Sequence, residues 1–84
     1  MKNRSRLDIL RDILVVCYTP KIITHIQYIC NLSWENTVEY LNLMLAQGLV
    51  EIQTDQQHKY YSTTMKGRQV VEKSEALLSL VVVR

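Results

Sequence analysis

The sequence is poor in the residues that interrupt or cross-link a fold. It has one proline, two glycines and two cysteines, and no phenylalanine. Because Cys17 and Cys30 have no second pair and no CxxC spacing, neither a zinc site nor a disulfide framework is indicated. We interpret both as small buried apolar side chains, with a disulfide between them as the alternative. The scarcity of proline and glycine, with 48% hydrophobic residues, indicates a folded, helix-rich chain.

Long apolar segments and catalytic motifs are also missing. No apolar run approaches the roughly 18 residues that span a membrane, and the N-terminus lacks the apolar region of a signal peptide. We therefore expect a cytoplasmic protein without membrane contact. The sequence has no glycine-rich phosphate loop, no HExxH and no nucleophile elbow. We accordingly expect no enzyme, no metal site, no cofactor and no identifiable small-molecule ligand.

Length and charge set further limits. A chain of 84 residues is one small domain, close to the size at which a single core is barely sufficient. So large an apolar content on so short a chain suggests an oligomer. The net charge of +2 does not by itself indicate a nucleic-acid partner. However, Lys2, Arg4 and Arg6 crowd the start of the chain and could contact phosphates or a minor groove, and a solvated tail is the alternative.

The first predicted helix runs from Ser5 to about Cys17. Ser5 is a suitable N-cap, and Asp8 occupies the position of the acidic residue in a capping box. Its predicted core stripe comprises Leu7, Leu10, Ile13, Leu14 and Cys17. Ile9 and Val16 fall to one side of that stripe, which leaves more apolar surface than one contact needs. We interpret the excess as a second packing surface, which another subunit could cover.

A second short helix is predicted after Tyr18. Thr19 is a good cap, and Pro20 suits the first helical position because its missing N–H costs nothing there. Lys21 then lies in the first turn, where a phosphate could also meet backbone N–H groups. The core side of this helix is predicted to comprise Ile22, Ile23, Ile26 and Ile29. It ends near Asn31, and a short turn leads to the next helix, as in a helix-turn-helix.

The third predicted helix covers about residues 33–47. Ser33 supplies the cap hydroxyl, and Gly48 suits the left-handed residue that ends a helix. Trp34, Val38, Leu41 and Leu45 share one side at helical spacing, with Trp34 interpreted as a core anchor. The opposite side is predicted to carry Glu35, Asn36, Glu39, Tyr40 and Leu43. Asn36 could pair with adenine and Tyr40 could donate to a phosphate, and an ordinary solvated surface is the alternative.

After Gly48 the apolar period changes from helical to alternating. Residues 49–53 and 59–62 are predicted as two strands of a hairpin, joined by a polar turn. Thr63 and Thr64 then cap a last helix that begins near Met65. One wide apolar face of that helix favours a partner helix; it comprises Val70, Val71, Ser74, Leu77, Leu78 and Val81. The order is α-α-α-β-β-α, in which the hairpin follows the third helix as a wing does.

Two stretches carry a resemblance to a known family. They are Leu32-Ser-Trp with Tyr40-Leu and Leu45-Ala-Gln-Gly-Leu-Val50, and then Tyr60-Tyr-Ser-Thr-Thr-Met-Lys-Gly-Arg68. The chain resembles the archaeal winged helix-turn-helix family of the small Sulfolobus ten-kilodalton chromatin-type DNA-binding proteins and related transcriptional regulators. The resemblance covers roughly residues 6–80. The sequence departs from the family in two respects. The third helix has Gln47 before the glycine and carries Glu35 and Glu39 but no Lys or Arg, and the final helix, to Arg84, is expected to be shorter than is usual in the family.

The resemblance implies a set of functional residues. It implies major-groove contacts by Ser33, Asn36, Thr37 and Tyr40, and wing contacts by His58 and Lys59. It also implies a homodimer in which the last helices form an antiparallel coiled coil. The implied seam comprises Val70, Val71, Ser74, Leu77, Leu78 and Val81.

Together these observations predict a mainly α protein with a β-hairpin wing. Residues 1–5 form a basic arm, 6–63 the winged helix-turn-helix and 64–84 a C-terminal dimerisation helix. The recognition helix covers about 33–47 and the wing about 49–62. The predicted function is binding of double-stranded DNA as a homodimer, as a nucleoid-associated transcriptional regulator or chromatin-architectural protein. The alternative is a winged helix that serves as a protein-interaction module, for which the acidic third helix is the main argument.

Overall fold

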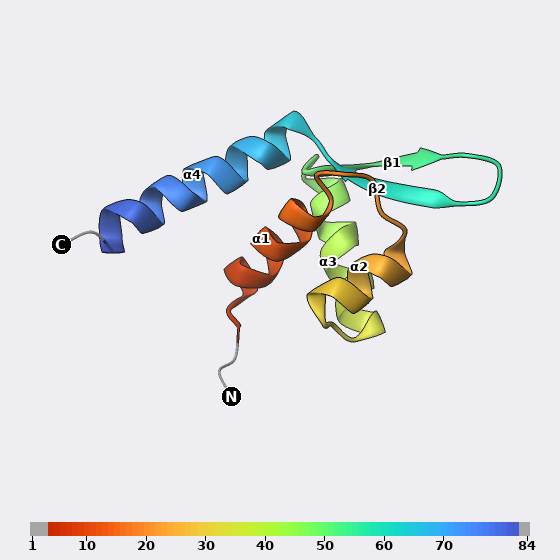
Figure 1. The fold of residues 1–84 in the computed structure, drawn as a ribbon, viewed down its shortest axis with the longest axis horizontal. Helices are drawn as coiled ribbons and strands as arrows, with labels where there is room; N and C mark the ends of the chain where they lie inside the picture. Colours follow the sequence, from red (N-terminus) through yellow and green to blue (C-terminus); the bar gives the residue numbers. More distant parts are fainter. Residues whose placement is uncertain (1–3, 83–84) are drawn as a thin grey trace.

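The structure is a computed structural model that describes the backbone of residues 4–82 and the side chains of residues 4–76. Helices and strands follow each other in the predicted order α-α-α-β-β-α (Figure 1). Their bounds are α1 Arg6–Val16, α2 Ile23–Cys30, α3 Trp34–Ala46, β1 Val50–Thr54, β2 Lys59–Thr63 and α4 Met65–Val82. The predicted fold class, a winged helix-turn-helix with an extended last helix, is confirmed.

The predicted caps of α1, α3 and α4 are present. The Ser5 hydroxyl accepts a hydrogen bond from the Asp8 N–H at 3.1 Å, and the Asp8 carboxylate accepts one from the Ser5 N–H at 3.2 Å. This reciprocal capping box fixes the start of α1. The Ser33 and Thr64 hydroxyls cap α3 and α4 in the same way, each accepting from a backbone N–H three residues on, at 3.1 Å. Local hydrogen-bonding chemistry therefore sets three of the four helix starts.

The start of α2 corrects the prediction. The helix begins at Ile23 rather than at Pro20, and its cap residue Ile22 has extended backbone. The backbone of Lys21 instead pairs with Tyr61 on β2, through N–H to O distances of 3.0 and 2.8 Å. The open edge of β2 therefore holds this connector in an extended form. Because residues paired with a strand cannot also be helical, Thr19 and Pro20 lie before the helix and do not cap it.

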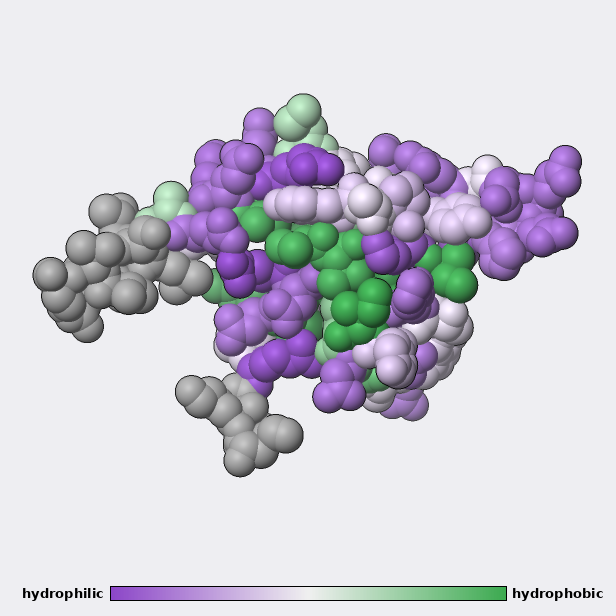
Figure 2. Space-filling model, in the orientation of Figure 1, coloured by the Kyte–Doolittle hydropathy of each residue, from purple (hydrophilic) through white to green (hydrophobic). Residues whose placement is uncertain are grey.

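The hairpin is a regular antiparallel pair in which Val50 lies opposite Thr63 and Thr54 opposite Lys59. Asp55 closes its loop, because its carboxylate accepts hydrogen bonds from the N–H groups of Gln57 at 2.9 Å and His58 at 2.8 Å. These two bonds hold the pKa of Asp55 below its usual value. The hairpin extends from the body of the molecule, and its tip is hydrophilic throughout (Figures 1 and 2).

One hydrophobic core joins α1, α2, α3, the base of the hairpin and the start of α4. Its buried members are Ile13, Leu14, Cys17, Ile26, Cys30, Tyr40, Leu41, Met44, Val50, Tyr61 and Val71. Cys17 and Cys30 are both buried with free thiols in this part of the chain, so their interpretation as small apolar core residues is confirmed.

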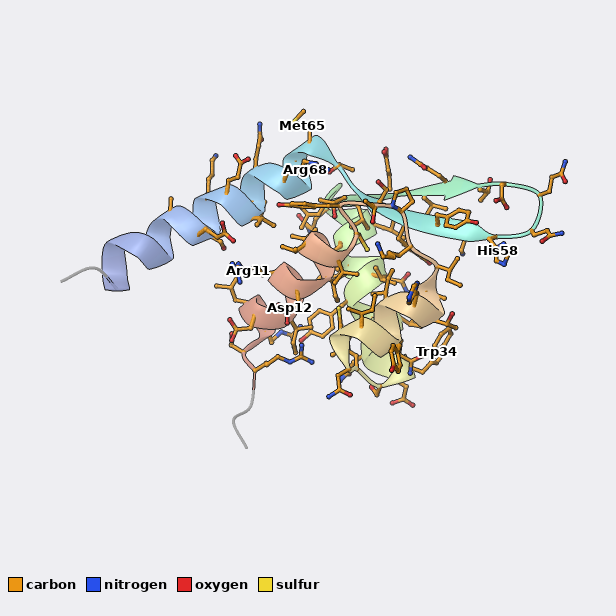
Figure 3. The ribbon with its side chains drawn as sticks, in the orientation of Figure 1. Arg11, Asp12, Trp34, His58, Met65 and Arg68 are labelled. Atoms are coloured by element: carbon orange, nitrogen blue, oxygen red, sulfur yellow. The ribbon has the colours of Figure 1, made fainter. Side chains whose placement is uncertain are left out.

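The predicted helix faces are partly wrong. The buried side of α3 comprises Thr37, Tyr40, Leu41 and Met44, whereas Trp34 is 50% exposed. On α1, Leu7 is 53% exposed, and on α2, Ile29 is exposed as well. Trp34 is the first residue of α3 and lies beyond the reach of the core at the outer end of the helix pair (Figure 3). A side chain at the end of a helix can point to the same side as the core residues and still have no neighbour to pack against.

The junction between β2 and α4 is held by Thr63 and Gly67. The Thr63 hydroxyl donates to the Leu14 carbonyl at 2.6 Å, and its N–H donates to the Cys17 carbonyl at 2.8 Å. These bonds satisfy carbonyls that the end of α1 leaves without helical partners. From there α4 runs outward on the side opposite the hairpin (Figure 1), so the molecule measures 51 × 31 × 19 Å. An ion pair between Arg11 and Glu75 joins α4 to α1.

Candidate nucleic-acid interface

The helix pair α2–α3 is joined by a tight turn. Asn31 ends α2 in the left-handed conformation with φ 56°, and the Leu32 N–H donates to the Gln27 carbonyl at 3.1 Å. This is the usual way to end a helix sharply, and it is available to Asn because its short polar side chain tolerates positive φ. Ser33 then begins α3 at once, so the turn fixes the direction in which the outer face of α3 points.

The outer face of α3 carries carboxylates and an amide. The exposed side chains are those of Trp34, Glu35, Asn36, Glu39, Asn42, Leu43 and Ala46. Glu35, Glu39 and Asn42 follow the i, i+4, i+7 spacing that places residues on one helix face. Asn42 was missed by the sequence analysis. The helical spacing from Glu35 and Glu39 could have identified Asn42. The prediction placed Tyr40 on the outward side instead, which rotated the predicted outward face away from Asn42.

Two predicted groove contacts are wrong. The Thr37 side chain is fully buried, and its hydroxyl donates to the Ser33 carbonyl at 2.8 Å. Tyr40 is only 6% exposed, and the Arg6 guanidinium lies 5.5 Å from the centre of its ring. Both side chains belong to the packed side of α3, so neither can reach a groove. Ser33 and Asn36 are exposed at the start of the helix and keep their predicted position.

The wing presents the predicted cations together. His58 and Lys59 are exposed where the loop enters β2, and the Lys59 ammonium lies 5.9 Å from the centre of the Tyr61 ring (Figure 3 labels His58). Lys21 lies beside β2 through its pairing with Tyr61, and its ammonium donates to the Thr19 hydroxyl. The structure thus brings Lys21 to the wing rather than to a helix N-terminus, a placement that sequence spacing did not indicate.

Arg4 is not part of a free arm. Its guanidinium forms an ion pair with Asp12 at 2.9 Å and donates to the Cys30 carbonyl oxygen at 2.6 Å. Since Cys30 is the last residue of α2, Arg4 ties the start of the chain to two helices. The prediction that Arg4 belongs to a solvated or DNA-binding arm is therefore corrected. The exposed guanidinium of Arg6 lies over the Tyr40 ring, and a DNA contact by Arg6 stays a prediction.

Comparison with known proteins identifies this arrangement. The family profile described as winged helix-turn-helix matches residues 3–81. The chain belongs to the winged helix-turn-helix family. Among curated protein sequences, none matches it significantly.

Solved winged-helix structures resemble the chain throughout. Sso10a-2, a DNA-binding protein from Sulfolobus solfataricus, is 26% identical with a TM-score of 0.81, over 92% of this chain and 81% of that one. The transcriptional regulator BldR from the same organism is 20% identical with a TM-score of 0.77, over 88% of this chain and 56% of that one. FabT of Streptococcus pneumoniae, solved in complex with DNA, is 17% identical with a TM-score of 0.67, over 93% and 61%.

The charges of this winged helix are unevenly distributed. No Lys or Arg occurs between Lys21 and Lys59, so α2, α3 and β1 contain no permanent cation. The same stretch holds Glu35, Glu39 and Glu51. Helix α3 is therefore acidic. The Lys and Arg side chains of the described residues lie on α1 and just before it, on the connector before α2, on the wing and on α4.

A small apolar groove lies between α1 and α4. It is lined by Leu7, Leu10, Leu14, Leu49, Val70 and Val71, with Arg11 and Ser74 at its edge. Val71 is buried within the chain, and Val70 is 37% exposed. Ile9 and Val16 are half-buried and pack against the chain's own core. Leu77, Leu78 and Val81 of the predicted seam lie in α4, and their side chains lie outside the described residues.

The described part of the chain offers neither a metal site nor a membrane span. No group of three His, Cys, Asp or Glu side chains is arranged there to hold a metal ion. Among the helices described, none is long and apolar enough to cross a membrane.

Proposed function

We propose that this chain binds double-stranded DNA as a homodimer, in transcription regulation or chromatin architecture. The observation that carries the proposal is the outward face of α3 beside a wing that presents His58 and Lys59, in a winged helix-turn-helix chain. Similarity to Sso10a-2, described as DNA-binding, and to the regulator BldR supports it. Such a function is exercised in the cytoplasm, at the nucleoid.

In this proposal the elements have separate roles. The recognition helix, residues 33–47, enters the major groove, and the wing, residues 49–62, lies along the backbone. Lys21, His58 and Lys59 contact phosphates, which supplies affinity without sequence preference. Residues 6–63 form the DNA-binding part of a single domain over 1–84. Residues 64–84 form the dimerisation helix.

The apolar groove between α1 and α4 supports dimerisation. Leu7 and Val70 expose apolar side chains on its two walls, which a partner could cover. Three residues of the predicted seam, Val70, Val71 and Ser74, line the groove. A second copy that packs its own α4 there would cover both side chains. Two copies would also present two recognition helices, as pseudo-palindromic sites require.

The test is a fluorescence-anisotropy titration with random-sequence duplex DNA at several salt concentrations. We expect sub-micromolar binding at low salt, with log K falling linearly against log salt concentration. Lys59→Ala should flatten that slope by about 1. Lys73→Ala is the matched control, because it removes the same charge from an exposed position on α4 and should leave the slope unchanged. Absence of binding at the lowest salt would overturn the proposal.

A second candidate is a protein-interaction module. Tyr28 on α2 is 81% exposed and Trp34 is 50% exposed, and both flank an acidic helix without cations. Large exposed aromatic side chains are common anchors of protein interfaces. This candidate becomes the better one if the titration finds no binding to any duplex.

A further inference from the structure

The outer face of α3 lacks the basic side chains that would bind DNA of any sequence with similar affinity. Glu35, Glu39 and Asn42 lie on one helix face and are exposed, opposite the buried side formed by Thr37, Tyr40, Leu41 and Met44. At 1.5 Å per residue, the three side chains span about 10 Å of the helix axis. Three successive base pairs cover about the same length. The centre of the reading surface is therefore two carboxylates and one amide.

We infer that Glu35, Glu39 and Asn42 make DNA binding conditional on base sequence, so that the protein is a selective regulator rather than a protein that coats DNA. The inference rests on the proposed function and adds the kind of duplex that it prefers. It assigns the discrimination between base sequences to three residues of α3, which the family match does not identify and which are distinct from the basic residues of the wing.

The chemistry of the three groups defines the preferred duplex. In the major groove a carboxylate can accept a hydrogen bond from the N4 amine of cytosine, and Asn can pair with N6 and N7 of adenine. A carboxylate that meets the oxygen or ring-nitrogen acceptors of guanine or thymine finds no donor. It is then desolvated beside phosphates of like charge, which is unfavourable. The expected site carries cytosine opposite Glu35 or Glu39 and adenine opposite Asn42.

The basic residues are placed where they do not offset the unfavourable free energy of the unpaired carboxylates. Lys21, His58 and Lys59 lie on the wing side and meet phosphates, which are the same in every sequence. No Lys or Arg on α3 offsets the carboxylates locally. The affinity for a random duplex therefore has two parts. The basic residues beside α3 raise it through their phosphate contacts, and the carboxylates of α3 lower it. A duplex that places cytosine and adenine amines opposite these residues removes the unfavourable contribution. The acidic residues therefore increase the difference in affinity between preferred and other sequences.

The test begins by selecting preferred duplexes from a random pool with the full chain. Anisotropy titrations then compare the selected and random duplexes at one salt concentration. We expect Glu39→Gln to strengthen binding to random duplex several-fold and to reduce the ratio of the two affinities about tenfold. Asn42→Ala should weaken the selected duplex about tenfold and leave random duplex unchanged. Glu72→Gln, which neutralises an exposed carboxylate on α4, is the matched control and should change neither.

The outcomes separate this inference from the proposed function. If the wild-type chain binds selected and random duplexes equally, or if the ratio is unaffected by Glu39→Gln and Asn42→Ala, the inference is overturned while DNA binding stands. If the wild-type chain binds no duplex, both are overturned. All three substitutions are at exposed positions, and equal circular dichroism and urea midpoints would show that each variant is folded.

Discussion

Arg4 and Cys30 are joined by a hydrogen bond of 2.6 Å from the guanidinium to the backbone carbonyl oxygen. That carbonyl belongs to the last residue of α2, where the helix dipole is negative and a cation is favourable. The same guanidinium pairs with Asp12 on α1 at 2.9 Å. One side chain near the start of the chain therefore holds the first two helices together.

This contact predicts that Arg4 acts on stability rather than on DNA affinity. Arg4→Ala should lower the free energy of unfolding by about 1 kcal/mol, because a charged hydrogen bond at a partly exposed site is lost. Urea unfolding measures the change, with Lys73→Ala as a control of equal charge. The same variant should leave the slope of log K against log salt as it is in the wild type. A slope flattened by about 1 would instead assign Arg4 to a phosphate.

The two glycines are expected to respond differently to alanine. At Gly67 a Cβ would lie 2.3 Å from the Leu49 carbonyl oxygen and 2.6 Å from the Thr63 Cγ2, so α4 would have to move. We expect Gly67→Ala to cost about 3 kcal/mol. Gly48 has φ +72° with open space around it, so Gly48→Ala should cost about 1 kcal/mol from backbone strain alone. Urea midpoints of both variants test the order; equal losses would contradict the close packing at Gly67.

The α1–α4 groove gives a prediction about assembly. Val70→Glu should convert the proposed dimer to a monomer, because it places a carboxylate in an apolar interface. Val70 is partly exposed within one chain, so the monomer itself should fold. Size-exclusion chromatography with light scattering measures the mass. Met65→Glu is the control at an exposed position on α4 that points away from the groove, and it should leave the mass unchanged (Figure 3). A Val70→Glu protein of dimeric mass would move the interface elsewhere.

Cys17 predicts a loss of stability in alkaline solution. Burial raises the pKa of its thiol from 9.0 to about 12, and the nearby Cys30 adds to the shift. Because the folded chain holds this proton more tightly than the unfolded one, the contribution is fully present below pH 9. It is lost as the pH rises from about 9 toward 12.

The test compares urea unfolding of the wild type and Cys17→Ala at several pH values. Between pH 9 and pH 10 the wild type should lose roughly 1 kcal/mol more than the variant does. Lysines and tyrosines titrate in both proteins, so the difference between the two reports on Cys17. Parallel pH profiles would show that the thiol is not held neutral by the fold.

Where local chemistry decided an outcome, the sequence sufficed. The caps at Ser5, Ser33 and Thr64 need only a hydroxyl and N–H groups three residues away, so all three were predictable. Which side chains of α3 face the core could not be predicted from the sequence. Trp34 and Tyr40 are amphipathic, and hydrophobic spacing alone assigned the first to the core and the second to the surface. The structure reverses both, because α1 places Arg6 over Tyr40 whereas Trp34 lies beyond the packed end of the helix pair.

The sequence by itself determined the order of helices and strands, the caps of α1, α3 and α4, and the absence of Lys and Arg from α3. These properties depend on neighbours along the chain. The tertiary structure alone decided that Lys21 pairs with β2, that Arg4 joins α1 to α2, and that Asn42 rather than Tyr40 lies on the outward face of α3. Each of these depends on residues distant in sequence, because a strand edge, a helix end or a packed face exists only once the chain has folded.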